Sequence, residues 1–294
     1  MVSELLLRVA LLFALAALAI GAAQRAGRLS GARVWQALAL ELATVSALVL
    51  PVWQGGVWLV AAALLLALAC ARELYAVLAL AGERPHARAG LALNASAVLL
   101  GAALPGGLAP AIAACGLALL ALGHPRARAL PGLRRLRSTL LGALYPGLCV
   151  GCTAALALRE GGFGYAVFAY ALAELNDSAA YLVGSSLQSR RVFPRLSPNK
   201  TLAGSAAGVL AALAASAFFA FLVPALSGAQ RLGAACLLAL GGPAGDLLAS
   251  GFKRRAGVKD FGNSVPIAGG ILDVYDSLIL VSPLLYFYLA ALGV

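Results

Sequence analysis

Aspartate and lysine are concentrated in one part of this sequence. All five Asp and all three Lys residues lie between positions 177 and 276. Carboxylates that converge repel one another unless a cation neutralises them, and hard oxygen ligands suit Mg²⁺. Lysine adds the point charge that a phosphate needs. The two residue types together predict metal-assisted phosphoryl or nucleotidyl transfer. They are Asp177, Asp246, Asp260, Asp273, Asp276, Lys200, Lys253 and Lys259.

The spacing of these residues predicts shared helix faces. Asp273 and Asp276 are three positions apart, and Asp246 and Ser250 are four apart, with Lys253 continuing the second stripe. We therefore expect Asp246, Asp273 and Asp276 to bind a metal directly or through water, with Asp177 as a further ligand or as a residue that orients the others. The alternative is that each Asp pairs with a nearby basic residue, and for Asp260 beside Lys259 the two interpretations have equal weight.

Two segments predict helix N-termini that could bind phosphate. Ser197-Pro198-Asn199-Lys200-Thr201 has a capping Ser and a Pro at the first helical position, followed by an apolar run. Gly269-Gly270 opens the last apolar segment in the same way and would let the backbone approach a ligand closely. Free N–H groups and the helix dipole at such ends favour an anion. Lys253, Arg254 and Lys259 add positive charge nearby.

The elements that must position these residues are membrane-spanning helices. The chain has 294 residues, of which 62% are hydrophobic and 11% charged, and its mean hydropathy is +0.94. These values exclude an ordinary soluble protein. We predict an all-α polytopic transmembrane bundle with roughly eight to ten spans, since each crossing takes about 20 apolar residues. The candidate spans are 5–23, 34–53, 56–80, 89–105, 108–123, 139–157, 163–184, 202–226, 230–251 and 270–293. The fourth and fifth are short and could form one re-entrant unit.

The basic residues predict the orientation of the chain. They cluster after the first, third, fifth, seventh and ninth spans, whereas the even-numbered connections hold only Arg159 and Arg231. By the positive-inside rule, the odd connections face the cytoplasm, together with the carboxylates of residues 177–276. We expect an integral protein of a bacterial inner membrane with its active site on the cytoplasmic side. Residues 1–160 would form a scaffold and residues 161–294 the catalytic region.

Several motifs in the last third of the chain resemble one enzyme family. The stretch Ser250-Gly251-Phe252-Lys253-Arg254 is followed by Lys259-Asp260-Phe261-Gly262, Pro266, Gly269-Gly270, Asp273 and Asp276. This arrangement resembles the C-terminal signature of the phosphatidate cytidylyltransferases, the CDP-diacylglycerol synthases. Upstream, Asp177-Ser178-Ala179-Ala180-Tyr181 and Ser197–Thr201 resemble that family's second motif block. The resemblance is specific over about residues 170–285.

The resemblance implies a reaction and a set of ligands. CTP and phosphatidate would give CDP-diacylglycerol and pyrophosphate, with Mg²⁺ required. Lys200 and Lys253 would hold nucleotide phosphates, and Arg254 or Lys259 the lipid phosphate or the leaving pyrophosphate. The expected partners are CTP, phosphatidate or a related lipid phosphate, and membrane lipids, with no nucleic acid. The sequence leaves open whether K⁺ accompanies Mg²⁺ and whether the chain forms a homodimer.

The sequence departs from the family pattern at several positions. The family usually has His before the Gly pair and Arg after the first Asp of the final Asp pair, where this chain has Ala268 and Val274. Ala249 and Ala203 also replace polar residues of the family. The missing groups include a cation that could stabilise a transition state, an effect of roughly a few kcal/mol. The true substrate could therefore be a different phospholipid or prenyl phosphate.

Two other functions fit parts of the sequence. A CTP-dependent lipid kinase of the polyprenol or dolichol kinase type would share the carboxylate and metal site, but it would release CDP instead of pyrophosphate. A secondary transporter or ion channel could use Asp177, Asp246 and Asp273 as an ion path. A transporter usually has ionisable groups near the midplane and inverted repeats. Here the carboxylates crowd one face, no repeat is found, and Glu41 and Glu73 are the only acidic candidates within spans elsewhere.

Overall fold

A computed structural model describes residues 2–25, 33–104, 130–187 and 189–294. They fall into two compact units, residues 1–53 and 54–294. The first unit contains the helices α1 (Val2–Arg25) and α2 (Arg33–Gln54). The predicted fifth span, 108–123, lies outside the described residues. The predicted functional division at residue 160 stays a prediction.

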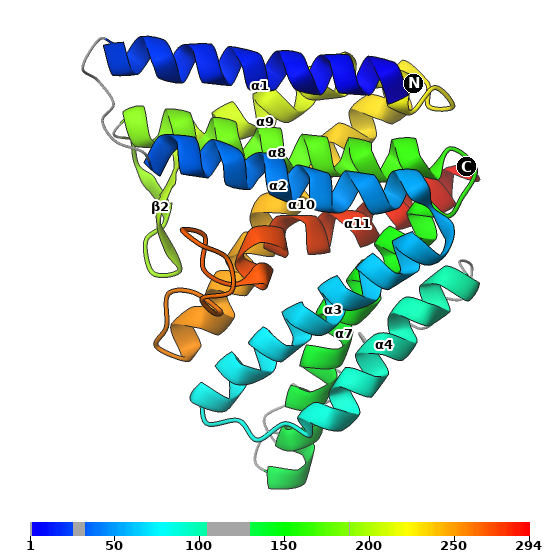
Figure 1. The fold of residues 1–294 in the computed structure, drawn as a ribbon. Coiled ribbons are helices and arrows are strands. Elements are labelled where there is room, and N and C mark those ends of the chain that lie inside the picture. The colour runs from blue at the N-terminus through cyan, green and yellow to red at the C-terminus, as the bar shows by residue number, and fades with distance from the viewer. Residues whose placement is uncertain (1, 26–32, 105–129, 188) are drawn as a thin grey trace. The chain divides into compact units, whose positions relative to one another are not determined.

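The second unit is a bundle of helices, which Figure 1 shows crossing at several angles. Its elements are α3 (Gly56–Leu80), α4 (Ala87–Ala103), α7 (Pro131–Ala157), α8 (Gly162–Ser186), α9 (Leu202–Phe218), the 3-10 helix η2 (Ala220–Leu222), α10 (Gly228–Arg255) and α11 (Ile271–Leu292). In the described part of the chain, five helices are long and apolar enough to cross a membrane: α2, α3, α7, α10 and α11. The all-α membrane bundle is therefore confirmed, whereas the count of eight to ten spans stays a prediction.

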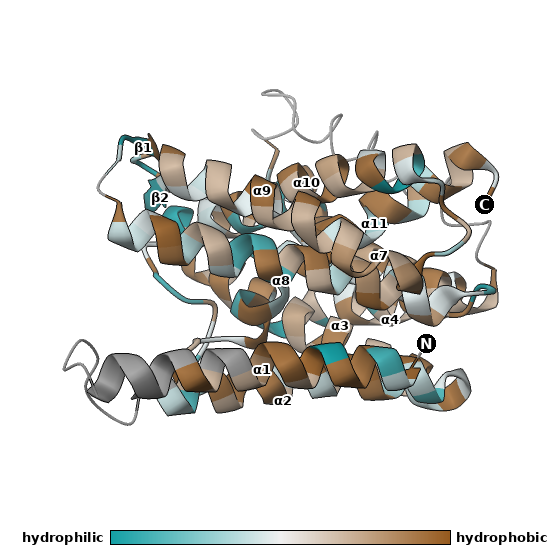
Figure 2. Ribbon diagram, turned by 90° about the horizontal axis from the view of Figure 1, so that it is seen from above, coloured by the Kyte–Doolittle hydropathy of each residue, from teal (hydrophilic) through white to brown (hydrophobic). Residues whose placement is uncertain are grey.

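Small residues allow the helices of the second unit to approach one another. A side chain at Gly208 of α9 would collide with Asn176 of α8, and one at Gly151 of α7 would collide with the backbone of α4 at Ala97. Close backbone approach through small residues is typical of helices packed in membranes. Hydrophobic residues cover most of the helical surface, and hydrophilic residues gather near the strands (Figure 2).

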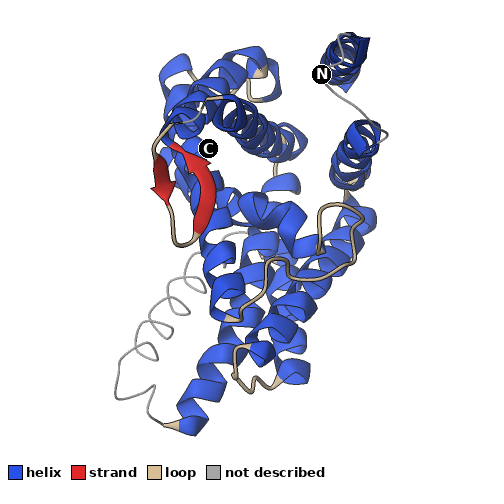
Figure 3. Ribbon diagram, turned by 90° about the vertical axis from the view of Figure 1, so that its left-hand side faces the viewer, coloured by secondary structure: helices blue, strands red, loops and turns tan. Residues whose placement is uncertain are grey.

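The only strands in the described residues form a short antiparallel hairpin between α8 and α9. Strand β1 (Arg191–Phe193) pairs with β2 (Ser197–Thr201), with Arg191 opposite Thr201 and Phe193 opposite Ser197 (Figure 3). The predicted helix N-terminus at Ser197 and Pro198 is therefore wrong. Proline fits the strand because a two-stranded sheet has only edges, where a missing N–H costs no internal hydrogen bond.

Helix α9 begins four residues later than the sequence suggested. Thr201 is its N-cap, and the Thr201 hydroxyl accepts a hydrogen bond from the Gly204 N–H. The helix ends at Phe218, so the predicted span 202–226 is shorter than expected. Lys200 consequently belongs to a strand that leads into the helix and not to the first helical turn.

A proline inside α10 fixes how that helix contacts α8. Pro243 has no N–H, so it cannot donate to the carbonyl of Ala239 one turn earlier. The buried amide of Asn176, on α8, donates to that carbonyl at 2.8 Å. Asn176 thus supplies the hydrogen bond that the proline removes. The contact places Asp177, the next residue, beside the middle of α10.

Candidate active site

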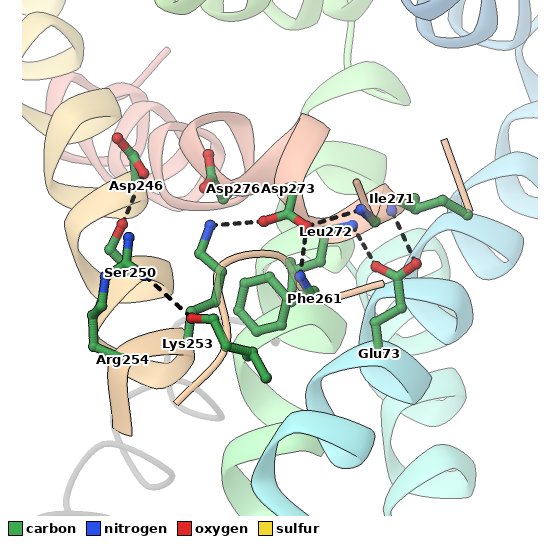
Figure 4. A network of polar contacts seen from close by, with 12 residues as sticks. Glu73, Asp246, Ser250, Lys253, Arg254, Phe261, Ile271, Leu272, Asp273 and Asp276 are labelled. Atoms are coloured by element: carbon green, nitrogen blue, oxygen red, sulfur yellow. Dashed lines mark hydrogen bonds and ion pairs between the residues drawn. The ribbon is translucent and has the colours of Figure 1, made fainter. Parts of the chain in front are cut away.

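Lys253 and Asp273 form an ion pair between the last turn of α10 and the first turn of α11. The Lys253 ammonium lies 2.7 Å from Asp273 Oδ1, and the two side chains are only 10% and 6% exposed. The ammonium also lies 5.2 Å from the centre of the Phe261 ring, a distance at which the ring face attracts a cation. Figure 4 shows Lys253 pointing at Asp273 from below. The structure thus brings these two predicted site residues into contact, and their roles in a site stay predictions.

The second oxygen of Asp273 organises the loop between the two helices. Asp273 Oδ2 accepts hydrogen bonds from the N–H groups of Phe261, at 2.6 Å, and of Gly270, at 2.8 Å. Within that loop, Val265 and Gly269 exchange two backbone hydrogen bonds. Both oxygens of Asp273 are thus engaged within the chain. Its predicted role as a direct metal ligand stays a prediction.

Glu73, from the middle of α3, holds the first turn of α11. Its Oε1 accepts from the Ile271 N–H at 3.0 Å and from the Ser264 hydroxyl at 2.8 Å. Its Oε2 accepts from the Leu272 N–H at 2.8 Å. A carboxylate at a helix N-terminus satisfies N–H groups that have no partner within the helix and interacts favourably with the helix dipole. Glu73 therefore acts as a remote N-cap (Figure 4).

This capping contradicts one sequence prediction. The N–H groups that follow Gly269 were expected to be free for a phosphate, but Asp273 and Glu73 already accept from Gly270, Ile271 and Leu272. The glycines serve a different purpose. A side chain at Gly270 would collide with the Glu73 carboxylate, and Gly269 has a φ of +102° that other residues rarely adopt.

The N-terminus of α9 is also occupied. The N–H of Leu202 donates to the Arg190 carbonyl, that of Ala203 to the Ser189 hydroxyl, and that of Gly204 to Thr201. At both helix ends predicted to bind phosphate, the N–H groups named above already have acceptors within the chain. Among the described residues, the cationic side chains are therefore the better candidates for contact with a phosphate.

Lys200 and Asp246 form the second ion pair of the site. The Lys200 ammonium lies 2.7 Å from Asp246 Oδ2 and donates to the Pro243 carbonyl at 3.2 Å. Ser250 donates to Asp246 Oδ1 at 3.3 Å, which confirms the predicted helical stripe. The Asp246 side chain is 30% exposed, much more than Asp273, so a ligand can reach it.

Asp276 and Asp177 meet at Ser277. The Ser277 hydroxyl lies 2.7 Å from Asp177 Oδ2 and 3.4 Å from Asp276 Oδ1. The structure therefore brings α8 and α11 together as predicted. Asp276 is only 7% exposed. The carboxylates of Asp246 and Asp177 are close enough to repel a negative charge on it. Among the described residues, no three or more His, Cys, Asp and Glu side chains form a group that could hold a metal ion.

Three predicted site residues lie at the edge of this cluster, and Asp260 is beside Gly269, close to Asp273. Arg254 turns outward, where it donates to the carbonyls of Leu196 and Val258. Lys259 and Asp260 are exposed in the loop that follows α10. Their predicted roles in substrate binding stay predictions. Pro198 and Asn199 lie in β2 beside Lys200.

A comparison with protein families identifies the chain. The model of the cytidylyltransferase family matches residues 35–292. The chain belongs to the cytidylyltransferase family. The match includes Glu73 and every residue of the two ion pairs described above.

Curated relatives of this cytidylyltransferase family member come from several bacteria. The uncharacterized protein YnbB of Escherichia coli K12 is 41% identical over 130 residues, 44% of either chain. A phosphatidate cytidylyltransferase of Bacillus subtilis 168 is 39% identical over 155 residues, 51% of this chain and 56% of the relative. One from Staphylococcus aureus COL is 39% identical over 128 residues, 43% of this chain and 49% of the relative. The chain spans about half the length of the curated relatives it matches.

Sequence reasoning missed the role of Glu73 in this cytidylyltransferase family site. The signal was an acidic residue in the middle of an apolar span, which is costly in a membrane and so marks a functional or structural site. It was overlooked because Glu73 lies about 200 positions before the residues it contacts. The two replaced family residues, Ala268 and Val274, lie next to Gly269 and Asp273.

Proposed function

We propose that this chain is an integral membrane nucleotidyltransferase that converts CTP and phosphatidate, or a related lipid phosphate, into a CDP-lipid and pyrophosphate. The observation that carries the proposal is the pairing of two lysines with two carboxylates of the helices α10 and α11. Lys200 contacts Asp246, and Lys253 contacts Asp273, each at 2.7 Å. The family match and the names of the curated relatives support the same reaction.

The carboxylate oxygens of the site are ligands that suit Mg²⁺. This ion keeps several waters and takes one or two carboxylates plus substrate phosphates, so it needs no cage of three or more protein side chains. Asp246 and Asp276 would hold it, because Asp246 is partly exposed and the only partner of Asp276 described here, Ser277, is 3.4 Å away. Asp177 would support the site through Ser277. Bound Mg²⁺ would neutralise the charge of the triphosphate and of the pyrophosphate that leaves.

The lysines would bind and orient phosphates. An ammonium has three N–H donors. Lys253 uses one for Asp273, and Lys200 uses two, for Asp246 and the Pro243 carbonyl. Each therefore keeps at least one donor for a phosphate oxygen. Glu73 and Asp273 act indirectly, because they fix the position of α11 and hence of Asp276.

The proposed reaction needs no general base. A phosphate monoester is already an anionic nucleophile, and its oxygen attacks the α-phosphorus of CTP. A new bond forms between that oxygen and phosphorus, while the bond from the α-phosphorus to the bridging oxygen of the β-phosphate breaks. Pyrophosphate leaves with the electron pair of that bond. Catalysis then consists of positioning and charge neutralisation, which is what the lysines and carboxylates provide.

We also propose that the site faces the cytoplasm from a bacterial inner membrane. The basic residues that follow the predicted odd-numbered spans support this orientation. The relatives named above are bacterial. CTP and the lipid phosphate would meet at the cytoplasmic surface, where both are available to this end of the bundle. A second metal such as K⁺ and a homodimer stay predictions.

Product analysis tests the proposed reaction. Purified protein in lipid nanodiscs is supplied with labelled CTP, phosphatidate and Mg²⁺, alongside the variant Asp276→Asn. We expect a CDP-lipid and an equal amount of pyrophosphate, with a loss of at least a hundredfold in the variant and in the presence of a Mg²⁺ chelator. Glu160→Gln, which removes an exposed carboxylate from the connection between α7 and α8, is the matched control and retains activity.

Other outcomes would replace the proposal. Release of CDP with a phosphorylated lipid alcohol would identify a CTP-dependent lipid kinase. Absence of CTP binding, measured by a CTP-dependent shift of the unfolding temperature, would exclude both enzymes and favour the transporter. Activity with prenyl phosphate and not with phosphatidate would keep the reaction and change the lipid.

A further inference from the structure

The hairpin β1–β2 carries an unusual combination of exposed side chains. Residues 190–196 are all exposed, and they combine arginines with apolar residues. The arginines are Arg190, Arg191 and Arg195. Val192, Phe193 and Leu196 are 37%, 41% and 38% exposed. A single exposed apolar residue is common on protein surfaces, whereas a group of them within a basic segment marks an interaction surface.

The positive charge of the hairpin is not compensated within the chain. No acidic residue occurs between Asp177 and Asp246 in the sequence. In the described part of the molecule, Arg190, Arg191 and Arg195 take part in no ion pair, whereas Lys200 at the end of β2 does. Three neighbouring unpaired arginines favour an anionic partner.

The hairpin also lies where a membrane surface is expected. It joins the C-terminal end of α8 to the N-terminal end of α9, directly beyond two apolar helices. Tyr181 and Leu182 in the last turns of α8 are 79% and 66% exposed, as expected for residues that face lipid. In Figure 1 the hairpin projects from the same end of the bundle as the loop that follows α10.

We propose that the hairpin lies in the headgroup layer of the membrane and binds anionic phospholipids. Arg190, Arg191 and Arg195 contact lipid phosphates, while Val192, Phe193 and Leu196 reach the upper part of the acyl chains. Arginine binds phosphate with two N–H groups at once, and basic segments with interspersed apolar residues are typical of interfacial elements. Free nucleotide is a poorer partner, because it would leave the three apolar side chains in water.

The hairpin is connected to the catalytic cluster at two points. Arg254, next to Lys253, donates to the Leu196 carbonyl at 3.3 Å, and Lys200 of β2 pairs with Asp246. If the proposed function holds, anionic lipid gathered by the hairpin includes the lipid phosphate substrate. The hairpin would then raise the local concentration of substrate beside Asp246 and lower the apparent KM for the lipid.

Hydrogen exchange of the intact protein tests the lipid contact without any need for catalysis. Deuterium uptake over residues 189–201 is compared in nanodiscs of neutral lipid and in nanodiscs with a third of anionic diacylglycerol phospholipid. We expect at least a twofold slower uptake with anionic lipid, and no such difference in the variant Arg191→Gln/Arg195→Gln. The variant Phe193→Ser should retain only part of the protection.

Arg84→Gln/Arg88→Gln is the matched control. It removes the same charge from two exposed residues, Arg84 in the connection between α3 and α4 and Arg88 in the first turn of α4, which the sequence places on the same side of the membrane. It should keep the full difference between the two lipids at residues 189–201. Equal uptake in both lipids, or loss of protection in this control as well, would overturn the proposal. Protection by CTP in neutral lipid, without protection by anionic lipid, would also overturn it and assign the hairpin to the nucleotide.

Kinetics separate this inference from the proposed function. In Arg191→Gln/Arg195→Gln we expect the KM for lipid phosphate to rise about fivefold or more, with kcat and the KM for CTP unchanged. If exchange shows the lipid contact but no substrate gives product, the hairpin assignment stands and the proposed reaction fails. If kcat falls while the KM for lipid and the exchange pattern stay unchanged, the hairpin inference fails instead.

Discussion

Glu73 shows how a single carboxylate can organise a site without touching substrate. It accepts two backbone N–H groups of α11 and the hydroxyl of Ser264, so it links α3 to the loop and to the helix that carries Asp276. An acidic side chain within an apolar helix is expensive unless such donors surround it. The capping contacts therefore explain why an acidic residue occupies this position in an apolar helix.

Replacement of Glu73 tests this role. Glu73→Gln keeps the size of the side chain but turns an acceptor into an NH₂ group that faces a backbone N–H. We expect a loss of about 2 kcal/mol in the free energy of unfolding, because hydrogen bonds to charged groups are worth more than neutral ones. Unfolding in an SDS titration measures it. Glu160→Gln is the control, and an equal loss in both variants would show that Glu73 has no special contacts.

Lys253 and Asp273 form the most buried pair of the site. Lys253→Met leaves the Asp273 carboxylate with two N–H donors and no counter-charge, so we expect a loss of about 3 kcal/mol in stability. Lys253→Met/Asp273→Asn should recover at least half of that loss while remaining inactive. A double-mutant cycle of unfolding free energies measures the coupling. Additive losses would mean that the two side chains do not interact.

At the scale of elements, prolines and amides set how the helices contact one another. Pro243 leaves the Ala239 carbonyl without its usual donor, and Asn176 replaces it from another helix. The two residues are 67 positions apart in the sequence, so local rules identify the proline but not its partner. The hydrogen bond between Asn176 and the Ala239 carbonyl thereby sets the position of Asp177 on α8 relative to Asp246 on α10.

A compensating change can test this contact between α8 and α10. Asn176→Leu leaves the Ala239 carbonyl unpaired in an apolar environment, which should cost about 1 to 3 kcal/mol. Adding Pro243→Ala restores an N–H within the helix, so the double variant Asn176→Leu/Pro243→Ala should be more stable than Asn176→Leu alone. Thermal unfolding in detergent compares them. A double variant that is less stable than both single ones would contradict the assignment.

The hairpin is the element that sequence rules assigned wrongly. Ser197, Pro198 and the apolar run after Thr201 match a helix start, yet residues 197–201 pair with 191–193. A local pattern carries no information about the partner strand. The same residues were therefore compatible with a helix start and with a strand. Lys200 still reaches Asp246 from the strand, because this contact depends on which elements meet and not on a helical conformation at Lys200.

At the scale of the whole molecule, a buried acid connects distant helices of the second unit. Glu83, in the connection after α3, is 4% exposed and contacts Arg137 of α7, at 3.1 Å, and Arg255 of α10, at 2.6 Å. The Ser138 hydroxyl donates to its other oxygen. The network joins the end of α10, which carries Lys253, to the helices that precede the predicted catalytic region.

The orientation of the molecule in the membrane can be measured by cysteine labelling. Lys259→Cys lies in the exposed loop beside the site, and Glu160→Cys in the connection between α7 and α8. By the positive-inside rule we expect a membrane-impermeant maleimide to label Glu160→Cys in intact cells and Lys259→Cys only in inverted vesicles. The unsubstituted protein, in which Cys236 is exposed, measures the background. Labelling of both positions from one side would contradict the predicted topology.

The sequence alone determined the class of the protein and the composition of its site. Long apolar segments can only be membrane helices, because backbone groups in lipid must satisfy one another within the segment. The concentration of Asp and Lys in residues 177–276 determined which side chains could do chemistry, since ionisable groups are too costly to occur there by chance.

Tertiary structure decided what each of these side chains does. Asp273 and Asp276 have the same type and share a helix face, yet one holds Lys253 and the following loop while the other has only a long contact with Ser277. Glu73 and Asn176 form hydrogen bonds with residues far away in the sequence, and local patterns do not reveal such contacts. A hydrogen bond or ion pair depends on distances between elements, and packing sets those distances after each helix has formed.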